Sequence, residues 1–246
     1  MAHDLRRDPL AAGRTGIVGQ LLADALRSAS AGGVVTPTVL DCGGGSGAFA
    51  VPFAQLGAAV TVVDISVDAL ATLTRRAAEG GVDALIDAVQ GDLEALPEVL
   101  HGRTFDLVLA HGVLDVLDDT AAGFAAMASA VRPGGLLSVL VANPVAGVLG
   151  RALAGDLAAA LRELGQLDAE QPGLSPETVR QLCAAAGLEV ESVHGVGVFT
   201  DLVPGSALDA PGAREALAEL EAATATRHPF ADIAGRQLLL ARRPGG

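Results

Sequence analysis

The segment from Asp41 to Gly47 combines a carboxylate with alternating glycines, in the pattern Asp-x-Gly-x-Gly-x-Gly. Glycine permits positive φ angles and has no Cβ, so such a segment can turn sharply while its backbone touches a ligand. We expect a strand before this loop and a helix after it, and the first turn of a helix offers free N–H groups. The pattern therefore predicts a ligand site formed by Asp41, Gly43, Gly44, Gly45 and Gly47.

Two classes of ligand use such a loop, and a tight turn without any ligand is a third possibility. Gly43, Gly45 and Ala48 also satisfy the dinucleotide fingerprint G-x-G-x-x-G/A. The carboxylate of Asp41 favours S-adenosylmethionine, because it can help to orient the ammonium group of that molecule. A pyrophosphate would gain nothing from a nearby carboxylate, so Asp41 disfavours NAD. Because the dinucleotide fingerprint is present, an NAD-dependent oxidoreductase is the alternative.

Two more carboxylates follow predicted strands. Asp64 ends a strand about 20 residues after the loop, where an acidic side chain binds ribose hydroxyls of either ligand. Asp92 comes after Gly91 and a short strand, where it can accept a hydrogen bond from an adenine amino group. Its alternative role is to cap a turn or helix. We include the adjacent Ile65 and Leu93 in the predicted cofactor site.

Arg132-Pro133-Gly134-Gly135 resembles the turn before the fifth strand of class I methyltransferases. The glycine loop, Asp64, Gly91-Asp92, Phe105 to Val108 and this turn occur in the order of that family, over about residues 34–142. The resemblance implies a Rossmann-like α/β fold with helices on both faces of a seven-stranded, mostly parallel sheet whose last strand is antiparallel. It also implies S-adenosylmethionine at the carboxyl ends of the strands.

A closer resemblance is to the SmtA/CmoM-like methyltransferases, bacterial enzymes that esterify the carboxyl group of a modified uridine in the tRNA anticodon. The similar stretches are Gly19 to Leu21, Leu109 to Asp115, Arg132 to Val139, Leu174 to Pro176, Gly195 to Phe199, and Glu219 to Glu221 with Pro229, Gly235 and Arg236. This resemblance implies cofactor contacts for Gly43, Gly44, Asp64 and His111, with His111 at the mouth of the site.

The chain departs from that family at two places. Leu22 stands where the family has an arginine that would pair with the methionine carboxylate, and Arg14 is a candidate substitute. The lysine-rich run before Leu-Ser-Pro is replaced by Asp168, Glu170 and Gln171. Such lysines would contact an RNA backbone, so their replacement favours a small-molecule acceptor over tRNA.

The composition also favours a small-molecule acceptor over tRNA. The 246 residues carry a formal net charge of −13, and 2% are aromatic. An acidic chain gains little from the phosphate neutralisation that dominates nucleic-acid affinity, and few rings are present for base stacking. Cys42 and Cys183 lack the spacing of a disulfide framework or a metal site, so we expect no metal. Without an apolar signal core or membrane-spanning stretch, the predicted location is cytoplasmic.

Strands alternate with helices as far as Ala142, which predicts a parallel sheet covered by helices. After Asn143 the pattern changes to a helical segment over residues 145–166 and a polar loop over residues 168–173. A capped helix over residues 175–186 and strands over residues 189–199 and 237–241 follow. We therefore predict a single methyltransferase domain over residues 1–246. Its parts are a cofactor-binding core (about 34–142), an inserted helical lid over the acceptor pocket (about 145–173) and a substrate-side segment (about 174–246).

The predicted reaction is methyl transfer from S-adenosylmethionine to an oxygen, such as a carboxylate, or to a nitrogen of a small molecule. The alternatives are a tRNA 5-carboxymethoxyuridine carboxyl methyltransferase, an NAD-dependent oxidoreductase, and a non-catalytic module that keeps the pocket as a scaffold. No catalytic base is assigned, because a carboxylate or phenolate nucleophile needs no proton removed at neutral pH and alignment supplies much of the catalysis. Arg227 and Arg236 are candidate anchors for an acceptor carboxylate.

Overall fold

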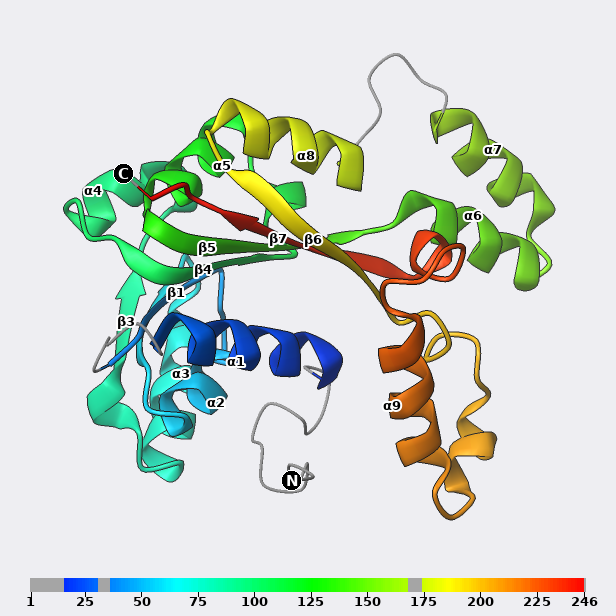
Figure 1. The fold of residues 1–246 in the computed structure, drawn as a ribbon, viewed down its shortest axis with the longest axis horizontal. Coiled ribbons are helices and arrows are strands. Elements are labelled where there is room, and N and C mark those ends of the chain that lie inside the picture. Colours follow the sequence, from blue (N-terminus) through cyan, green and yellow to red (C-terminus); the bar gives the residue numbers. More distant parts are fainter. Residues whose placement is uncertain (1–15, 31–35, 168–173, 246) are drawn as a thin grey trace. The chain divides into compact units, whose positions relative to one another are not determined.

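The computed structural model describes residues 16–30, 36–167 and 174–245 (Figure 1). Its strands are β1 (Thr38–Cys42), β2 (Ala59–Asp64), β3 (Ile86–Gln90), β4 (Phe105–His111), β5 (Val131–Ala142), β6 (Glu189–Val196) and β7 (Arg236–Arg242). Its helices are α1 (Gly16–Ser30), α2 (Ala50–Gln55), α3 (Val67–Glu79), α4 (Leu96–Leu100), α5 (Thr120–Ser129), α6 (Pro144–Leu153), α7 (Leu157–Leu167), α8 (Pro176–Ala185) and α9 (Ala213–Thr224). Short 3-10 helices lie at Asp83–Leu85, Leu93–Ala95, Leu114–Val116, Gly205–Asp209 and Ala231–Ile233.

The seven strands form one sheet in the order β3-β2-β1-β4-β5-β7-β6. β1 pairs in parallel with β2 on one side and with β4 on the other, with Thr38 opposite Ala59 and Val39 opposite Leu107. β3 continues the parallel arrangement beside β2. The central strands are buried over nearly their whole length, because a parallel sheet is covered on both faces and selects continuous apolar runs. The predicted seven-stranded α/β fold is confirmed.

The predicted turn at residues 132–135 is wrong, because these residues belong to β5. The N–H of Gly134 donates to the carbonyl of Arg243 (2.9 Å), and the N–H of Arg243 donates to the carbonyl of Gly135 (3.0 Å). Gly134 and Gly135 thus both lie opposite Arg243 on the antiparallel partner strand. This arrangement is a β-bulge, and its first residue, Gly134, has a left-handed backbone conformation (φ +76°). The chain therefore bends here without leaving the sheet, and β7 runs antiparallel to β5.

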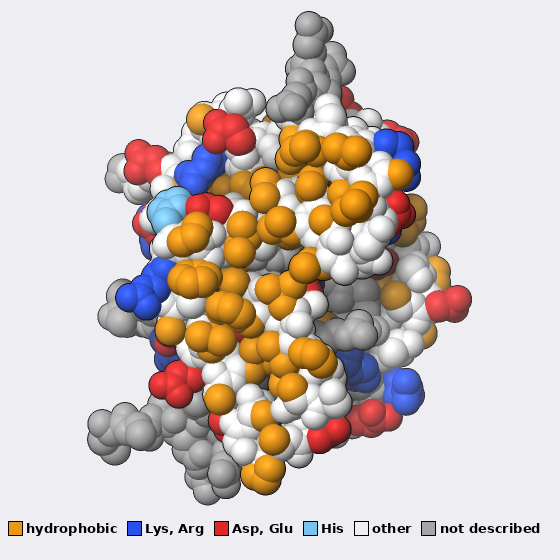
Figure 2. Space-filling model, turned by 90° about the vertical axis from the view of Figure 1, so that its right-hand side faces the viewer, with side chains coloured by type: hydrophobic (Ala, Val, Ile, Leu, Met, Phe, Trp, Pro, Cys, Tyr) orange, Lys and Arg blue, Asp and Glu red, His pale blue; other side chains and the backbone are white. Residues whose placement is uncertain are grey.

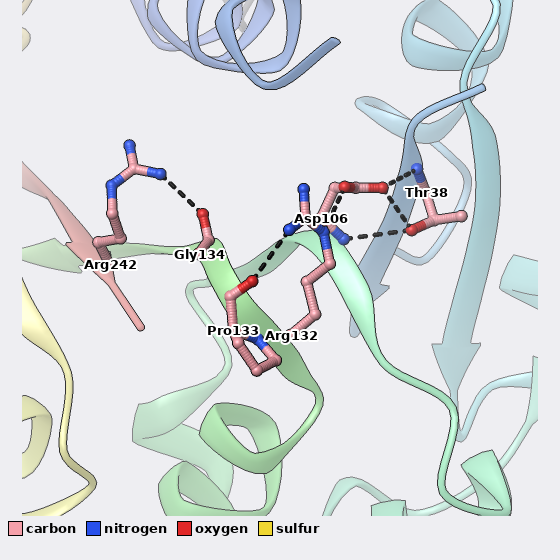
Figure 3. A network of polar contacts seen from close by, with 6 residues as sticks. All are labelled: Thr38, Asp106, Arg132, Pro133, Gly134 and Arg242. Atoms are coloured by element: carbon pink, nitrogen blue, oxygen red, sulfur yellow. Dashed lines mark hydrogen bonds and ion pairs between the residues drawn. The ribbon is translucent and has the colours of Figure 1, made fainter. Parts of the chain in front are cut away.

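A polar network fastens the amino ends of β1, β4 and β5 (Figure 3). The carboxylate of Asp106 accepts hydrogen bonds from the N–H and hydroxyl of Thr38 (2.7 and 2.8 Å) and from Nε of Arg132 (2.6 Å). Burial alone would raise the pKa of Asp106, but the hydrogen bonds from Thr38 and the Arg132 guanidinium together hold it below its ordinary value. Nearby, Arg242 donates to the carbonyl of Gly134 (2.8 Å). These contacts lie at the opposite end of the strands from the glycine loop.

The chain packs as two compact units. The first contains the chain up to Val139 together with Leu182–Glu191 and the chain from Leu240 onward, and the second contains Leu140–Gln181 and Ser192–Leu239. In the first unit, α1, α2 and α3 lie on one side of β1 to β4, and α4 and α5 lie on the other (Figure 1). Leu22 of α1 is fully buried, so this residue has a core position. Arg14, its suggested substitute, lies outside the described residues.

In the second unit, the segment predicted to be helical over residues 145–166 is divided into two helices, α6 and α7. Gly155 adopts a left-handed conformation (φ +80°), and the Asp156 carboxylate then accepts from the N–H of Ala159 (2.9 Å), which begins a new helix. Both helices carry large aliphatic side chains that are 41% to 71% exposed, and Figure 2 shows apolar side chains gathered on the face turned toward the viewer. These exposed residues are Val145, Leu149, Leu153, Leu157, Leu161 and Leu164.

Serine side chains cap two helices, and the cap predicted for the helix over residues 175–186 is confirmed. The Ser66 hydroxyl accepts from the N–H of Ala69 (3.2 Å) at the start of α3, and the Ser175 hydroxyl accepts from the N–H of Thr178 (3.1 Å) before α8. Cys42 and Cys183 are both buried. The segment over residues 168–173, which contains the acidic replacements for the family lysines, lies outside the described residues.

Candidate functional site

The glycine loop connects β1 to α2 through backbone conformations that few other residues adopt. Gly43, Gly45 and Gly47 have φ angles of +66°, +53° and +78°. At Gly43 an added Cβ would also lie 2.4 Å from Cγ1 of Val113, a residue that follows β4. The N–H of Gly43 donates to the carbonyl of Val63 (2.7 Å), which holds the start of the loop against β2. The loop is thus fitted closely to both neighbouring strand ends.

Asp64, the last residue of β2, holds the middle of the loop. Its Oδ2 accepts from the N–H of Gly45 (2.9 Å), and its Oδ1 accepts from the N–H of Ser66 (2.8 Å). A carboxylate has about four lone-pair sites, so Asp64 can accept further hydrogen bonds while it keeps these two. The side chain is therefore positioned by the protein and still able to bind the hydroxyls of a ligand.

Asp41 lies beneath the loop, with only 3% of its surface exposed. Its Oδ2 has no hydrogen-bond partner among the described residues. Burial, and secondly the charge of Asp64, raise the pKa of Asp41 to about 7. A buried carboxyl without a partner is costly in its charged form, so a positively charged ligand group close to it would be stabilised. This environment fits the role predicted for Asp41 beside a ligand ammonium.

We expect the Asp41→Asn variant to gain stability relative to the wild type as the pH rises from about 4 to 7. In that interval the unfolded chain loses the Asp41 proton while the folded protein keeps it, so folding becomes less favourable by about 1.4 kcal/mol per pH unit. The total loss of folding free energy over this interval is on the order of 4 kcal/mol, and it is absent from the variant because asparagine has no proton to lose. Urea unfolding of both proteins between pH 4.5 and 8 measures the difference, with the exposed Asp68→Asn as control. A difference that does not change with pH would contradict the expectation.

A cleft of about 420 Å³ opens at the carboxyl ends of the parallel strands, which is enough for a small organic ligand. Ile65 and Val116 line it and are 72% and 77% exposed, an unusual exposure for large aliphatic side chains. The complete lining is Gly43, Asp64, Ile65, Gly91, Asp92, Leu93, Glu94, Gly112, Val113, Val116, Leu117 and Asp118. Six residues of the predicted cofactor site therefore meet at one cleft: Gly43, Asp64, Ile65, Gly91, Asp92 and Leu93.

Asp92 has the capping role that the sequence left open. Its Oδ1 accepts from the N–H of Glu94 (3.0 Å) at the start of the 3-10 helix Leu93–Ala95. The same side chain lines the cleft, so capping does not prevent contact with a ligand. The backbone of Gly91 is tied to the end of β2 by its N–H, which donates to the carbonyl of Asp64 (3.2 Å). The predicted adenine contact of Asp92 stays a prediction.

His111 ends β4, and its ring packs against Phe49 and Ser138. Its Nε2 lies 2.9 Å from Oγ of the fully buried Ser138, and its ring meets that of Phe49 edge-on, with the ring centres 4.9 Å apart. His111 is absent from the cleft lining, as are Asp41, Gly44, Gly45 and Gly47. Asp41 lies beneath the loop, and Gly44, Gly45 and Gly47 belong to it. A direct cofactor contact by His111 stays a prediction.

Six lining residues were not predicted: Glu94, Gly112, Val113, Val116, Leu117 and Asp118. All follow β3 or β4, and ligands of open α/β sheets bind outside the carboxyl ends of strands, so this rule was the available signal. Arg227 and Arg236 are exposed residues of the second unit, and neither lines the cleft. Their predicted role as anchors of an acceptor carboxylate stays a prediction.

The charged residues of the cleft lining all have the same sign. Asp64, Asp92, Glu94 and Asp118 are acidic, and none of the lining residues is a lysine, arginine or histidine. Within the described residues, no His, Cys, Asp and Glu side chains gather in a group of three or more that could bind a metal ion. No helix in the described ranges is both long enough and apolar enough to cross a membrane.

Comparison with known proteins places this geometry in a family. A family model for a methyltransferase domain matches residues 39–135, which contain the loop and every residue that lines the cleft. The ubiquinone biosynthesis O-methyltransferase of Azotobacter vinelandii is 31% identical over 160 residues, 64% of this chain and 67% of that protein. The chain belongs to the S-adenosylmethionine-dependent methyltransferases.

Two further methyltransferases resemble the chain over most of its length. The tRNA 5-carboxymethoxyuridine methyltransferase of Escherichia coli K12 is 26% identical over 212 residues, 84% of this chain and 80% of that protein. The magnesium protoporphyrin IX methyltransferase of Synechocystis PCC 6803, solved with bound S-adenosylhomocysteine, shares the fold, with a TM-score of 0.57. It is 19% identical, and the match covers 98% of this chain and 93% of that one. Other ubiquinone biosynthesis O-methyltransferases match over shorter regions, and this chain spans only 40% of the length of two of them.

The glycine loop alone admits S-adenosylmethionine or NAD. Because the chain belongs to the methyltransferase family, the cofactor is S-adenosylmethionine. The predicted resemblance to tRNA carboxymethoxyuridine methyltransferases is confirmed as a similarity. The residues also fit the family's cofactor: the cleft is large enough, Asp64 offers acceptors, and Oδ2 of Asp41 has no hydrogen-bond partner in the part of the chain that the structure describes.

Proposed function

We propose that this methyltransferase binds S-adenosylmethionine in the cleft and transfers its methyl group to an oxygen or nitrogen of a small molecule. The observation that carries the proposal is the cleft itself, where Asp64 is bonded to the glycine loop and every charged lining residue is acidic. S-adenosylmethionine carries a sulfonium and an ammonium group, whereas NAD carries two phosphates. A cleft with four carboxylates and no basic residue favours the first ligand and disfavours the second.

The residues divide the binding task by their chemistry. Asp64 accepts hydrogen bonds from the ribose hydroxyls, the charge of Asp41 acts on the ammonium group from beneath the loop, and Ile65 and Val116 supply apolar walls for the adenine. The bound cofactor supplies a methyl group on a positively charged sulfur. The chain's contribution is to hold an acceptor in line with that methyl group and to exclude water. An ionised carboxylate or phenolate acceptor needs no base, so none is assigned.

Replacement of Asp64 by alanine should weaken cofactor binding by about 1–3 kcal/mol, because the ribose hydroxyls lose a charged acceptor. Calorimetric titration with S-adenosylhomocysteine measures the change. Asp83→Ala is the control, since Asp83 is exposed and lies before β3, away from the cleft. An unchanged affinity in Asp64→Ala would show that Asp64 does not bind the ribose.

Two assays test the proposal as a whole. The first is titration with S-adenosylhomocysteine and, separately, with NADH, and we expect binding of the former alone. Binding of NADH alone would overturn the proposed cofactor. The second is transfer of a labelled methyl group from S-adenosylmethionine to a pool of small metabolites. Cofactor binding without transfer to any acceptor would instead support a non-catalytic module.

Methylation of tRNA is the second candidate function, because the E. coli relative that is similar over 84% of this chain is a tRNA methyltransferase. The net charge of −13 opposes it, since RNA binding gains most from basic side chains. Filter binding to bulk tRNA at moderate salt separates the two candidates. The small-molecule proposal expects no binding at micromolar protein, and tight binding would favour the tRNA activity.

We also propose that α6 and α7 contribute to an apolar acceptor site, as the lid predicted over residues 145–173. Their exposed leucines support this proposal, because such side chains are stabilised by contact with an apolar molecule. Leu153→Ser and Leu161→Ser should then raise the KM for an apolar acceptor, once one is found, while cofactor affinity stays the same. A lower cofactor affinity with an unchanged KM would contradict the role.

A further inference from the structure

Asp41 is a buried carboxyl group beside the backbone of the glycine loop. Only 3% of the residue is exposed, and its Oδ2 has no hydrogen-bond partner among the residues that the structure describes. A Cβ added at Gly44 would lie 2.4 Å from this oxygen, so the carboxyl group lies directly against the loop. Burial of a carboxylate that lacks a partner is costly, and the neutral acid avoids most of this cost. The surroundings that the protein supplies therefore favour the protonated form of Asp41.

The acidic groups on β1 and β2 strengthen this preference. Asp64 ends β2, and its carboxylate accepts from the N–H of Gly45 in the same loop. Burial, and secondly the charge of Asp64, raise the pKa of Asp41 to about 7. Burial, and secondly Asp41, raise the pKa of the adjacent Cys42 thiol, so this thiol stays neutral at physiological pH. The two strands thus add no positive charge that would ionise Asp41.

The basic side chains on the elements around β1 have other contacts. Nε2 of His111, at the end of β4, lies 2.9 Å from a serine hydroxyl of β5. Arg76 of α3 reaches the glycine loop and donates to the carbonyl of Ser46 (2.7 Å). Arg27 of α1 forms an ion pair with Asp24 (2.7 Å), and α2 and α5 contain no titratable side chain. Within the described part of the chain nothing lowers the pKa of Asp41, so a positively charged ligand group is what can ionise it.

The proposed cofactor brings such a group. In the proposed function, the charge of Asp41 acts on the ammonium group of the cofactor from beneath the loop. A positive charge near a carboxyl group favours its ionised form, so binding makes Asp41 a stronger acid. This coupling is reciprocal. A proton on Asp41 therefore weakens cofactor binding by the same factor by which the cofactor weakens proton binding.

We propose that cofactor binding ionises Asp41, so that a cofactor molecule entering the cleft displaces a proton from this buried carboxyl group into the solvent. The inference rests on the proposed function. In this step only the O–H bond of Asp41 breaks, and its electron pair stays on the carboxylate. Cofactor affinity is therefore highest above about pH 7, where Asp41 has already lost its proton, and it falls as the pH decreases.

Calorimetric titration of the full chain with S-adenosylhomocysteine at pH 5.5, 6.5, 7.5 and 8.5 tests the inference. This product keeps the ammonium group and is not consumed. We expect the affinity of the wild type to rise at least about tenfold from pH 5.5 to 7.5 and to change little above that, because one proton contributes a factor of up to about ten per pH unit. Asp41→Asn should bind with an affinity that is nearly independent of pH, because its amide has no proton to lose.

Comparison of the two proteins at each pH isolates Asp41, because a titration of the ligand itself affects both equally and cancels. Asp83→Asn is the matched control, because it removes an exposed acidic group that lies before β3, away from the cleft. This control should keep the pH dependence of the wild type. Thermal unfolding checks that each variant is folded.

The number of protons released gives a second measurement, which needs no variant. Heats of binding in two buffers with different ionisation enthalpies yield this number. At pH 6 the wild type should release close to one proton for each ligand bound, and at pH 8.5 close to none. A merely structural role for Asp41 would change the affinity of Asp41→Asn without any release of protons by the wild type.

The possible outcomes separate this inference from the proposed function. If the wild type binds the ligand with an affinity independent of pH and releases no proton, the inference is overturned and the cofactor site stands. If Asp41→Asn keeps the pH dependence of the wild type, another group loses the proton, which also overturns the inference. Should Asp41→Asn bind too weakly to measure, the proton count of the wild type decides. If the wild type binds S-adenosylhomocysteine at none of these pH values, the proposed function itself fails.

Discussion

Replacement of Glu221 by alanine is expected to lower the free energy of unfolding by about 4 kcal/mol. The Glu221 carboxylate of α9 is only 7% exposed and accepts four hydrogen bonds. The donors are the N–H groups of Val198 (3.0 Å), Phe199 (2.9 Å) and Thr200 (2.7 Å), and the hydroxyl of Thr200 (2.8 Å). Hydrogen bonds to a charged acceptor are stronger than neutral ones, and a buried donor without an acceptor is costly. The segment after β6 therefore depends on this one side chain.

Urea unfolding followed by circular dichroism measures the loss. Glu219→Ala is the matched control, because Glu219 lies on the same helix, is exposed, and should change stability by less than about 0.5 kcal/mol. Glu221→Gln should be intermediate, because an amide oxygen can replace Oε1, whereas the amide nitrogen would face the N–H of Val198. Equal stabilities of the Glu221 and Glu219 variants would show that the four bonds contribute little.

Gly44→Ala should reduce the affinity for S-adenosylhomocysteine at least about 100-fold, equivalent to about 2.7 kcal/mol. An added Cβ at Gly44 would lie 2.4 Å from Oδ2 and 2.5 Å from Cγ of Asp41. The aspartate side chain is short and buried, so it cannot move away as the end of a long side chain would. Relief of the clash must shift either the loop or Asp41, and both belong to the predicted cofactor site. Gly44 has no positive φ, so the effect is steric.

Calorimetry on the folded variant gives the affinity, and unfolding in urea confirms that the variant is folded. Gly150→Ala is the control, because an added Cβ at that position in α6 meets nothing within 4 Å. It should leave the cofactor affinity unchanged and raise stability slightly, since alanine favours helix more than glycine does. Near-normal affinity in Gly44→Ala would mean that the loop does not contact the cofactor as proposed.

Much of the fold could be predicted from local pattern, because buried parallel strands are continuous apolar runs and helices carry recognisable caps. β2 (Ala59–Asp64) is such an apolar run, and α3 (Val67–Glu79) begins after the Ser66 cap. The bulge at Gly134 could not be predicted in this way, because it depends on pairing with Arg243, far away in the chain. The break between α6 and α7 had a local signal in Gly155 and Asp156, but the helical spacing of the leucines on both sides concealed it.

The site was predicted where a motif fixes the backbone and missed where the lining depends on how a connecting segment folds. Asp64 and Asp92 were found because each directly follows a strand or its glycine. Glu94 and Asp118 were missed because a hydrogen bond between two connecting segments sets their place beside the cleft. His111 is at the predicted strand end, but its ring packs against Phe49 and Ser138 and does not line the cleft, which spacing along the chain does not reveal.

The network of Thr38, Asp106 and Arg132 has a consequence for how this protein can be altered. It joins three strands at the amino end of the sheet, whereas the cleft lies at the carboxyl end of the same strands. Substitutions in the segments after β3 and β4 therefore leave the joints between the strands untouched. The contacts that join the strands and the residues that bind a ligand therefore lie at opposite ends of the sheet. Substitutions that change the ligand preference can be selected at one end without weakening the contacts at the other.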